Sequence, residues 1–366
     1  MVNSPATKNQ YTPRTVSHPG VTLSAKIQEM GMSIREFALR TAKPEKTILA
    51  VIRGDSSITA DMAVIFENVT MIPAHFWIAR QRNYDEFLAQ SRMAKRIETS
   101  SAWADSFPAE LMVKYGWIQP FTDLSSKTKS LLRFFAVTSA DAWENYYINQ
   151  QLKVAFRISL RSTSNPYAIS AWLRQGDRQA TAIVLSEKYS DKKLRQYILN
   201  MKRLMVNKPD NWSVQLQELC ALCGIKLVYT QSLPEAPING ATRWLASRYP
   251  CIQMSCDEKR YDTFWFSFFH EIGHILLHGK KDFFLENIDY DNKENDKEME
   301  ADNFSANLLL SQSQEKQIVS TGDFSAESIM KYAESFGTHP LIIIGRLRYL
   351  HLVSEDYYTR FLELVS

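Results

Sequence analysis

Long apolar runs are missing from this sequence. In 366 residues, no stretch approaches the roughly 20 consecutive apolar residues that a transmembrane helix requires. The first 20 residues are polar, so they have the character of neither a signal peptide nor an anchor. These features predict a cytoplasmic protein without a membrane partner.

Cysteine is also scarce, with four residues in the whole chain. Cys220 and Cys223 have a CxxC spacing, and with Cys251 and Cys256 they could in principle form a four-thiolate zinc site. The first two, however, lie in an apolar pattern of helical period, and Cys251 lies in an alternating pattern typical of a strand. We therefore expect reduced cysteines that pack as small hydrophobic residues.

The net charge of +3 is small but unevenly distributed. Residues 1–90 contain 10 basic and 8 acidic side chains, residues 91–209 contain 19 and 9, and residues 210–366 contain 14 and 23. The basic middle could attract the acidic C-terminal part, or meet an acidic partner or nucleic acid.

The most informative stretch is the apolar segment that contains His270, Glu271, His274 and His278. Residues i and i+4 lie on one face of a helix, so His270 and His274 can bind one Zn²⁺. Glu271 lies about 100° around the helix, where its carboxylate can act as general base on a metal-bound water. His278 is one turn further along and is expected to support the site or end the helix.

A third protein ligand is expected from the acidic segment that follows. Glu300 begins an apolar stripe made by Ala301, Phe304 and Leu308, where a carboxylate needs a compensating partner. Glu294, Asp296 and Glu298 are interpreted as solvated charges. Asp302 is a plausible acceptor for a ligand-histidine N–H. Pattern alone leaves the choice of Glu300 open.

Residues 210 to about 353 resemble the ImmA/IrrE family of metallo-endopeptidases. The resemblance rests on HEIGH at 270–274, on EADNFSANLLL at 300–310, on Asn239-Gly240 and on residues 337–340 and 345–348. It implies His270, His274 and Glu300 as zinc ligands and Glu271 as base. The departures from the family pattern are Ser305 in place of Ala and Ser311 in place of Met-Pro.

The first part of the chain predicts a polar, disordered leader over residues 1–17 and then five short helices. Ser33 and Thr59 are expected helix caps, and Gly31 and Gly54 are expected helix ends. The second and third helices are joined by about three residues, as in a helix-turn-helix. A plain helical docking bundle is the alternative.

Residues 18 to about 90 resemble the HigA/VapI-type antitoxins of the XRE helix-turn-helix superfamily. The matching segments are residues 18–20, 33–38, 47–54, 58–63 and 75–77. The resemblance implies operator-like DNA as a partner, contacted by these five residues: Ser33, Lys43, Lys46, Thr47 and Arg53. Glu45 and a net charge of +2 over residues 1–90 weaken this prediction, and homodimerisation could be needed for tight binding.

Residues 91–209 predict a basic helical linker or sensor region for ligand sensing or partner docking. Trp172 with Arg174 and Arg178 could form a nucleic-acid surface, but a solvated basic face around a helical core is favoured. In the C-terminal part, the pattern predicts a helix from Trp212 to Cys223 and strands at 225–230 and 250–255.

Together these patterns predict a mostly α, multidomain protein. It has an all-α helix-turn-helix domain at 18–90, a helical middle at 91–209 and an α+β zincin-like domain of the HExxH gluzincin type at 210–366. The expected function is a DNA-binding regulatory zinc metallo-endopeptidase that cleaves a specific protein, such as a repressor or a toxin–antitoxin component. The alternative is an antitoxin-like transcriptional regulator whose zinc domain senses a ligand or partner without proteolysis.

Overall fold

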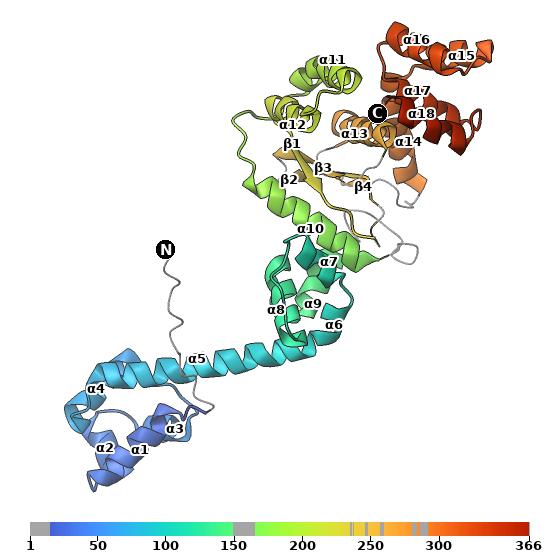
Figure 1. The fold of residues 1–366 in the computed structure, drawn as a ribbon. Helices are drawn as coiled ribbons and strands as arrows, with labels where there is room; N and C mark the ends of the chain where they lie inside the picture. Colours follow the sequence, from blue (N-terminus) through green and yellow to red (C-terminus); the bar gives the residue numbers. More distant parts are fainter. Residues whose placement is uncertain are drawn as a thin grey trace, which may run out of the picture. The chain divides into compact units, whose positions relative to one another are not determined.

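The computed structural model describes residues 15–148, 165–234, 236, 238–245, 248–256, 260–279, 284–285 and 292–365. Residues 1–14 of the predicted leader lie outside this set. The chain divides into two compact units, of which one ends at Thr99 and the other begins at Ser100 (Figure 1). Each unit has its own buried apolar residues.

The first unit consists of five helices around one core (Figure 1). The helices are α1 (Pro19–Glu29), α2 (Ile34–Arg40), α3 (Glu45–Arg53), α4 (Ala60–Thr70) and α5 (Ala74–Thr99). Phe37, Phe66 and Trp77 form an aromatic centre in which neighbouring ring centroids are 5.4 and 6.1 Å apart. The five predicted helices are therefore present, although α5 runs beyond the expected boundary at residue 90.

The ends of these helices follow their sequence signals. Ser33 accepts a hydrogen bond from Glu36 N, and Thr59 accepts one from Met62 N, which satisfies amide groups that have no partner within the helix. Gly54 ends α3 with a φ of +83°, a left-handed conformation that favours glycine. The side chain of Glu36 does not complete a capping box but pairs with Arg40.

The second unit begins with short helices around an aromatic core. These are α6 (Ser101–Asp105), α7 (Ala109–Lys114), α8 (Leu124–Phe135), α9 (Ala140–Trp143) and the longer α10 (Pro166–Ala182). Trp143 stacks on Tyr167 at 5.0 Å and packs edge-on against Phe107 at 5.4 Å. Trp172 is completely buried, so it cannot serve as the exposed aromatic platform of a nucleic-acid surface.

A four-stranded mixed sheet lies in the middle of this unit. The strands are β1 (Lys226–Thr230), β2 (Gly240–Leu245), β3 (Tyr249–Ser255) and β4 (Phe284–Leu285), in the order β1-β3-β2-β4. β1 pairs parallel with β3, and β2 pairs antiparallel with β3 and β4. The sequence predicted β1 and β3. It missed β2, which is buried along most of its length and has no polar–apolar alternation.

Helices cover both faces of the sheet (Figure 1). On one face, Val228 and Cys251 pack with Ala180 of α10, and Gln253 donates a hydrogen bond to Trp172 O at 2.7 Å. On the other face, Leu227, Ile252 and Met254 pack against α12 (Trp212–Leu222) and α13 (Tyr261–Leu277). Helix α10, from the predicted middle region, is therefore part of the layered core that supports α13.

The remaining helices complete this unit. They are α11 (Asp191–Asn207), α14 (Asn292–Leu309), α15 (Gln312–Thr321), α16 (Ala326–Phe336), α17 (Pro340–Tyr349) and α18 (Glu355–Val365). The result is the expected mostly α, multidomain fold with an α+β C-terminal part. Among the helices of the described residues, none is both long enough and apolar enough to cross a membrane.

The closest helix crossing in the first unit depends on Gly20. A Cβ atom at this position would lie 1.9 Å from Val51 O, a backbone atom of α3 that cannot move away independently. We predict that Gly20→Ala destabilises the first unit by about 1–3 kcal/mol through overpacking, despite a gain in helix propensity of about 1 kcal/mol. Hydrogen exchange on the full chain should show lost protection in α1 and α3.

Val21→Ala is the matched control, because Val21 neighbours Gly20 on α1 and is 56% exposed. Protection in α13 should be unchanged in both variants. Equal exchange in Gly20→Ala and Val21→Ala would contradict the close-crossing argument.

Candidate metal centre

The centre is built on α13, a helix that is apolar around most of its circumference. Phe264, Trp265, Phe268, Phe269 and Ile272 are buried on it, so the helix lies inside the unit rather than on its surface. His270 and His274 are each 2% exposed, and Glu271 is fully buried. Burial of these polar side chains costs free energy unless they have hydrogen-bonding or charged partners, so the groups around them indicate their role.

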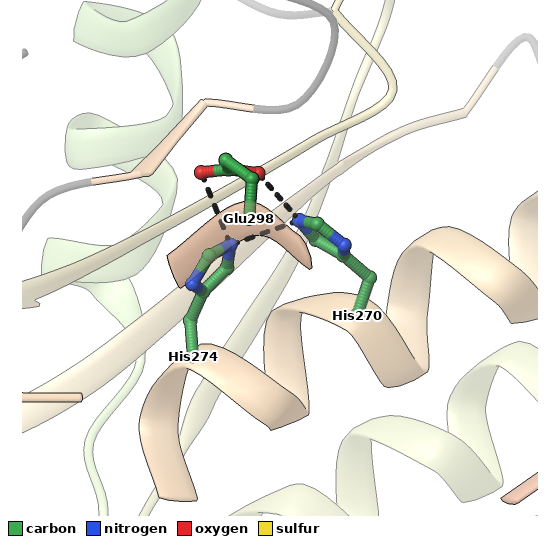
Figure 2. A group of neighbouring side chains, drawn as sticks. All are labelled: His270, His274 and Glu298. Carbon is green, nitrogen blue, oxygen red and sulfur yellow. Dashed lines mark hydrogen bonds and ion pairs between the residues drawn. The ribbon is translucent and has the colours of Figure 1, made fainter. Parts of the chain in front are cut away.

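The two imidazoles meet at one point. His270 Nε2 and His274 Nε2 are 2.8 Å apart, and both face the same carboxylate, that of Glu298 (Figure 2). One Glu298 oxygen lies 3.1 Å from His270 Nε2 and the other lies 3.4 Å from His274 Nε2. Within the described residues, these three are the His, Cys, Asp and Glu side chains found close enough together to share an ion.

This donor set fits a zinc ion. Ligand atoms at about 2.0–2.1 Å from a tetrahedral Zn²⁺ lie roughly 3.3 Å from one another, close to the separations in this cluster. Two imidazole nitrogens and one carboxylate are also the three protein ligands of a common class of catalytic zinc site, which leaves a fourth position open. A cation between these atoms would balance the buried charge of Glu298.

Glu300, the expected third ligand, lies elsewhere. Its carboxylate is 63% exposed and contacts His278 Nε2 at 3.1 Å. The buried positions of α14 are Ala301, Ser305 and Leu309, and Glu298 extends that row toward its N-terminus. The apolar stripe predicted from the sequence began at Glu300, two residues after Glu298. Two residues correspond to about 200° around a helix, so the two carboxylates point in different directions. The geometry thus replaces Glu300 with Glu298.

Sequence reasoning missed Glu298, although a signal for it was available. Asp302 was identified as an acceptor for a ligand histidine, and it lies four residues after Glu298, on the same helix face. In the structure, Asp302 Oδ1 is 2.8 Å from His270 Nδ1. An ionised Asp302 can only accept, so Nδ1 carries the proton and Nε2 presents its lone pair to the cluster.

Close packing of α13 and α14 lets Glu298 reach the histidines. A Cβ atom on Gly273 would lie 3.2 Å from Ala301 Cα and 3.2 Å from the Phe304 ring, tighter than most real contacts. Ser305 Oγ donates to Phe266 O at 2.7 Å, across the same contact. Small residues on both helices therefore set the distance across which the carboxylate must reach.

Electrostatics keep the cluster in a metal-ready protonation state. Burial lowers the pKa of His274 to about 4, although Glu298 opposes this shift. Burial would raise the pKa of Glu298, but its contacts with His270 and His274 outweigh burial and lower that pKa to about 2. At neutral pH, His274 is therefore neutral and Glu298 is ionised, as metal ligands must be.

Two further groups contact His274. The Phe284 ring of β4 stacks on its imidazole, with centroids 3.8 Å apart and planes 8° from parallel. His278 Nδ1 lies 2.9 Å from His274 Nδ1. His278, expected to support the site, thus directly contacts a candidate ligand and does not join the cluster of three.

Glu271 lies against β2. A Cβ atom on Gly240 would be 2.6 Å from Glu271 Oε1, so the glycine provides the space for this carboxylate. Nearby Arg243 is 5% exposed and pairs with Asp177 of α10 at 2.7 Å. Burial would lower the pKa of Arg243, but Asp177 and, more weakly, Glu271 raise it, so the guanidinium remains charged.

Tyr261 and His339 are held in place by structural contacts. Tyr261 Oη donates to Met205 O at 2.6 Å, and its ring lies 4.8 Å from that of His339. His339 Nδ1 accepts from Leu341 N and caps α17. These contacts account for both side chains without the metal cluster.

A cavity of about 520 Å³ is lined in part by Asp302, whose carboxylate contacts His270 Nδ1. It lies between α13, α14 and α17, and its lining includes Phe266, Met299, Ile342 and Arg346. Its size is that of a typical small-ligand or side-chain pocket. Its mixed lining suits an apolar group with a polar end.

Three of the four cysteines are buried, as the pattern predicted, and the fourth is not. Cys220, Cys223 and Cys251 are buried free thiols, and Cys256 is exposed. Burial raises the pKa of Cys223 to about 11, which disfavours the thiolate that metal binding requires.

The predicted DNA-contacting residues lie on or beside α3 in the first unit. Lys46 and Arg53 are exposed on α3, and Thr47 is half-buried there. Ser33 is exposed before α2, where it caps that helix. Lys43 forms an ion pair with Asp61 at 2.7 Å, so its charge is partly neutralised.

Comparison with protein families identifies the C-terminal part of the chain. Residues 228–347 match the model of a peptidase family described as the IrrE N-terminal-like domain. This segment is similar to that family. The match includes all three residues of the cluster as well as Glu271, and it confirms the ImmA/IrrE resemblance of the sequence. This IrrE-like domain is thus metallopeptidase-like.

Two solved structures similar to part of the chain are of antidote proteins. One, of a HigA family, from Coxiella burnetii, has 31% identity and a TM-score of 0.22, and the match covers 23% of this chain and 91% of that one. Another, from Nostoc punctiforme, is described as an antidote protein of a plasmid maintenance system. It has 24% identity and a TM-score of 0.23, with 23% and 92% covered. Such TM-scores support no argument about the fold. No curated protein matches the chain.

The geometry of the IrrE-like domain predicts which acidic residue binds metal. Glu298→Ala should weaken zinc binding more than about 100-fold, because it removes one of three ligands and leaves two. Asp296→Ala removes an exposed carboxylate from the same helix and should bind zinc like the unaltered protein. Equilibrium competition with a chromophoric chelator measures both. If Glu300→Ala were more damaging than Glu298→Ala, this ligand set would be wrong.

Proposed function

We propose that this protein is a zinc-dependent endopeptidase that cleaves a specific protein partner and binds DNA through its first unit. The observation that carries the proposal is the meeting of His270, His274 and Glu298 (Figure 2), together with a fully buried carboxylate on Glu271, the residue that follows His270 on the same helix. Either feature alone has structural explanations. Together they supply the ligands and the base of metal-assisted peptide hydrolysis.

The chemistry follows from the positions of these residues. When bound, Zn²⁺ acts as a Lewis acid that makes water a nucleophile at neutral pH and stabilises negative charge on the carbonyl oxygen. Glu271 follows His270 on the same helix, so its carboxylate can take the proton of the attacking water and pass it to the leaving amine. Gly240 leaves room for that carboxylate beside β2.

An extended substrate has a place beside the cluster. Strand β4 pairs with β2, and its Phe284 stacks on His274, so this side of the sheet lies next to the metal ligands. Peptides commonly bind to proteins by adding a strand to a sheet edge. The cavity next to Asp302 would accept one substrate side chain and contribute to specificity.

The proposed substrate is a repressor or a component of a toxin–antitoxin system. This part of the proposal rests on the helix-turn-helix of α2 and α3 in the same chain, since a DNA-bound peptidase meets proteins that occupy the same promoter. The alternative is an antitoxin-like regulator that uses the zinc domain for sensing. Loss of the Glu271 carboxylate distinguishes the two functions.

Glu271→Gln should retain zinc but lose proteolysis by about 10²- to 10⁴-fold, the usual contribution of a general base. Cells that express the unaltered chain, Glu271→Gln or Asp296→Asn would be compared by sequencing newly formed protein N-termini. We expect new termini with the unaltered chain and Asp296→Asn only. If Glu271→Gln regulates its promoter like the unaltered protein and no termini differ, the sensing function is correct.

DNA binding makes a separate prediction. Lys46→Ala and Arg53→Ala should weaken binding to duplex DNA, and each lost phosphate contact should lower the slope of log affinity against log salt by about 1. Lys331→Ala removes an exposed basic side chain, paired with Glu327, from the other unit and is the control. Identical salt slopes for all three variants would place the DNA contact elsewhere or exclude it.

A further inference from the structure

A row of hydrogen-bonding groups leads from His274 to Glu300, a carboxylate that is not part of the cluster of three. Three groups lie in a row: His274 Nδ1 is 2.9 Å from His278 Nδ1, and His278 Nε2 is 3.1 Å from Glu300 Oε2. The His278 side chain is 4% exposed, whereas Glu300 is 63% exposed. The row therefore runs from a buried candidate ligand to the surface of α14.

The chemistry of the three groups allows few proton positions. An ionised carboxylate only accepts hydrogen bonds, so Glu300 requires a proton on His278 Nε2. A neutral His278 then has a lone pair on Nδ1 and must accept from His274 Nδ1–H. His274 is left with its lone pair on Nε2, the atom that faces His270 and Glu298. The reverse order would place a proton where a metal must bind.

We infer that His278 and Glu300 are positioning residues that fix the zinc-binding tautomer of His274. Glu300 thereby controls metal affinity from the surface without touching the metal. The inference rests on the proposed zinc site. It also makes the two histidine ligands equivalent, because Asp302 holds the Nδ1 proton of His270 directly and Glu300 holds that of His274 through His278.

Packing supports a positioning role. Phe284 stacks on the His274 ring at 3.8 Å and lies 5.1 Å from the His278 ring, so both imidazoles are held against one aromatic side chain. With its ring plane fixed, His274 has its two nitrogens in set directions. What remains to be fixed is which nitrogen carries the proton. Groups that settle this for a ligand histidine typically change metal affinity by 10- to 100-fold.

The test measures zinc affinity of the full chain by chelator competition in four variants. Glu300→Ala and His278→Leu should each weaken binding by about 10- to 100-fold. His278→Asn retains an acceptor near the Nδ1 position and should recover most of the affinity lost in His278→Leu. Asp296→Ala removes an exposed carboxylate from α14 without touching a histidine and should match the unaltered chain.

Glu300→Ala changes a surface residue, so its result does not depend on repacking the core. If Glu300→Ala binds zinc as tightly as Asp296→Ala, the inference is overturned, and the same holds if His278→Asn is as weak as His278→Leu. If the unaltered chain binds no zinc, the proposed function fails. The tautomer of His278, read from its ¹⁵N chemical shifts, then decides the inference: Nε2–H supports it and Nδ1–H overturns it.

Discussion

The site depends on how closely α13 and α14 approach each other. Gly273 and Ala301 meet at this crossing, where one additional methyl group would meet backbone and an aromatic ring. Only at this distance can Glu298 place one oxygen near each histidine. The three residues of the cluster come from α13 and from the facing helix α14, so the cluster is determined by helix packing rather than by loop conformation.

Packing of α10 against the sheet explains why this helix, predicted to lie in a separate middle region, belongs to the second unit. α10 packs against β1 and β3, and its Asp177 forms the buried ion pair with Arg243 of β2. Gln253 of β3 bonds to the Trp172 carbonyl of the same helix. Removing one partner from such buried pairs leaves an uncompensated polar group, which is strongly destabilising. Helix α10, which lies in the region interpreted as a basic linker, thus packs against the sheet that supports Glu271.

The sequence predicted the elements whose signal is local. The caps Ser33 and Thr59, the terminating Gly54, and the HExxH spacing on α13 depend on neighbours within one helical turn, so a pattern reveals them. Glu298 and β2 depend on distant contacts. Glu298 resembles a solvated charge until α13 is placed beside it. β2 is buried by groups distant in sequence, such as Glu271, whose backbone carbonyl accepts from Thr242, and Asp177, which bonds to Arg243. Glu300 was predicted from its place at the start of an apolar stripe, and in the structure its carboxylate contacts His278.

The three acidic residues of α14 constrain the register of the two helices together. Glu298 contacts His270 and His274, Asp302 contacts His270 from behind, and Glu300 contacts His278. A shift of α14 by one residue would rotate each carboxylate by about 100° and break all of these contacts at once. The alternation of acidic residues at 298, 300 and 302 is therefore not a solvated charge run. Each carboxylate contacts different ring nitrogens of histidines 270, 274 and 278. One register of α13 against α14 therefore allows all of these contacts together.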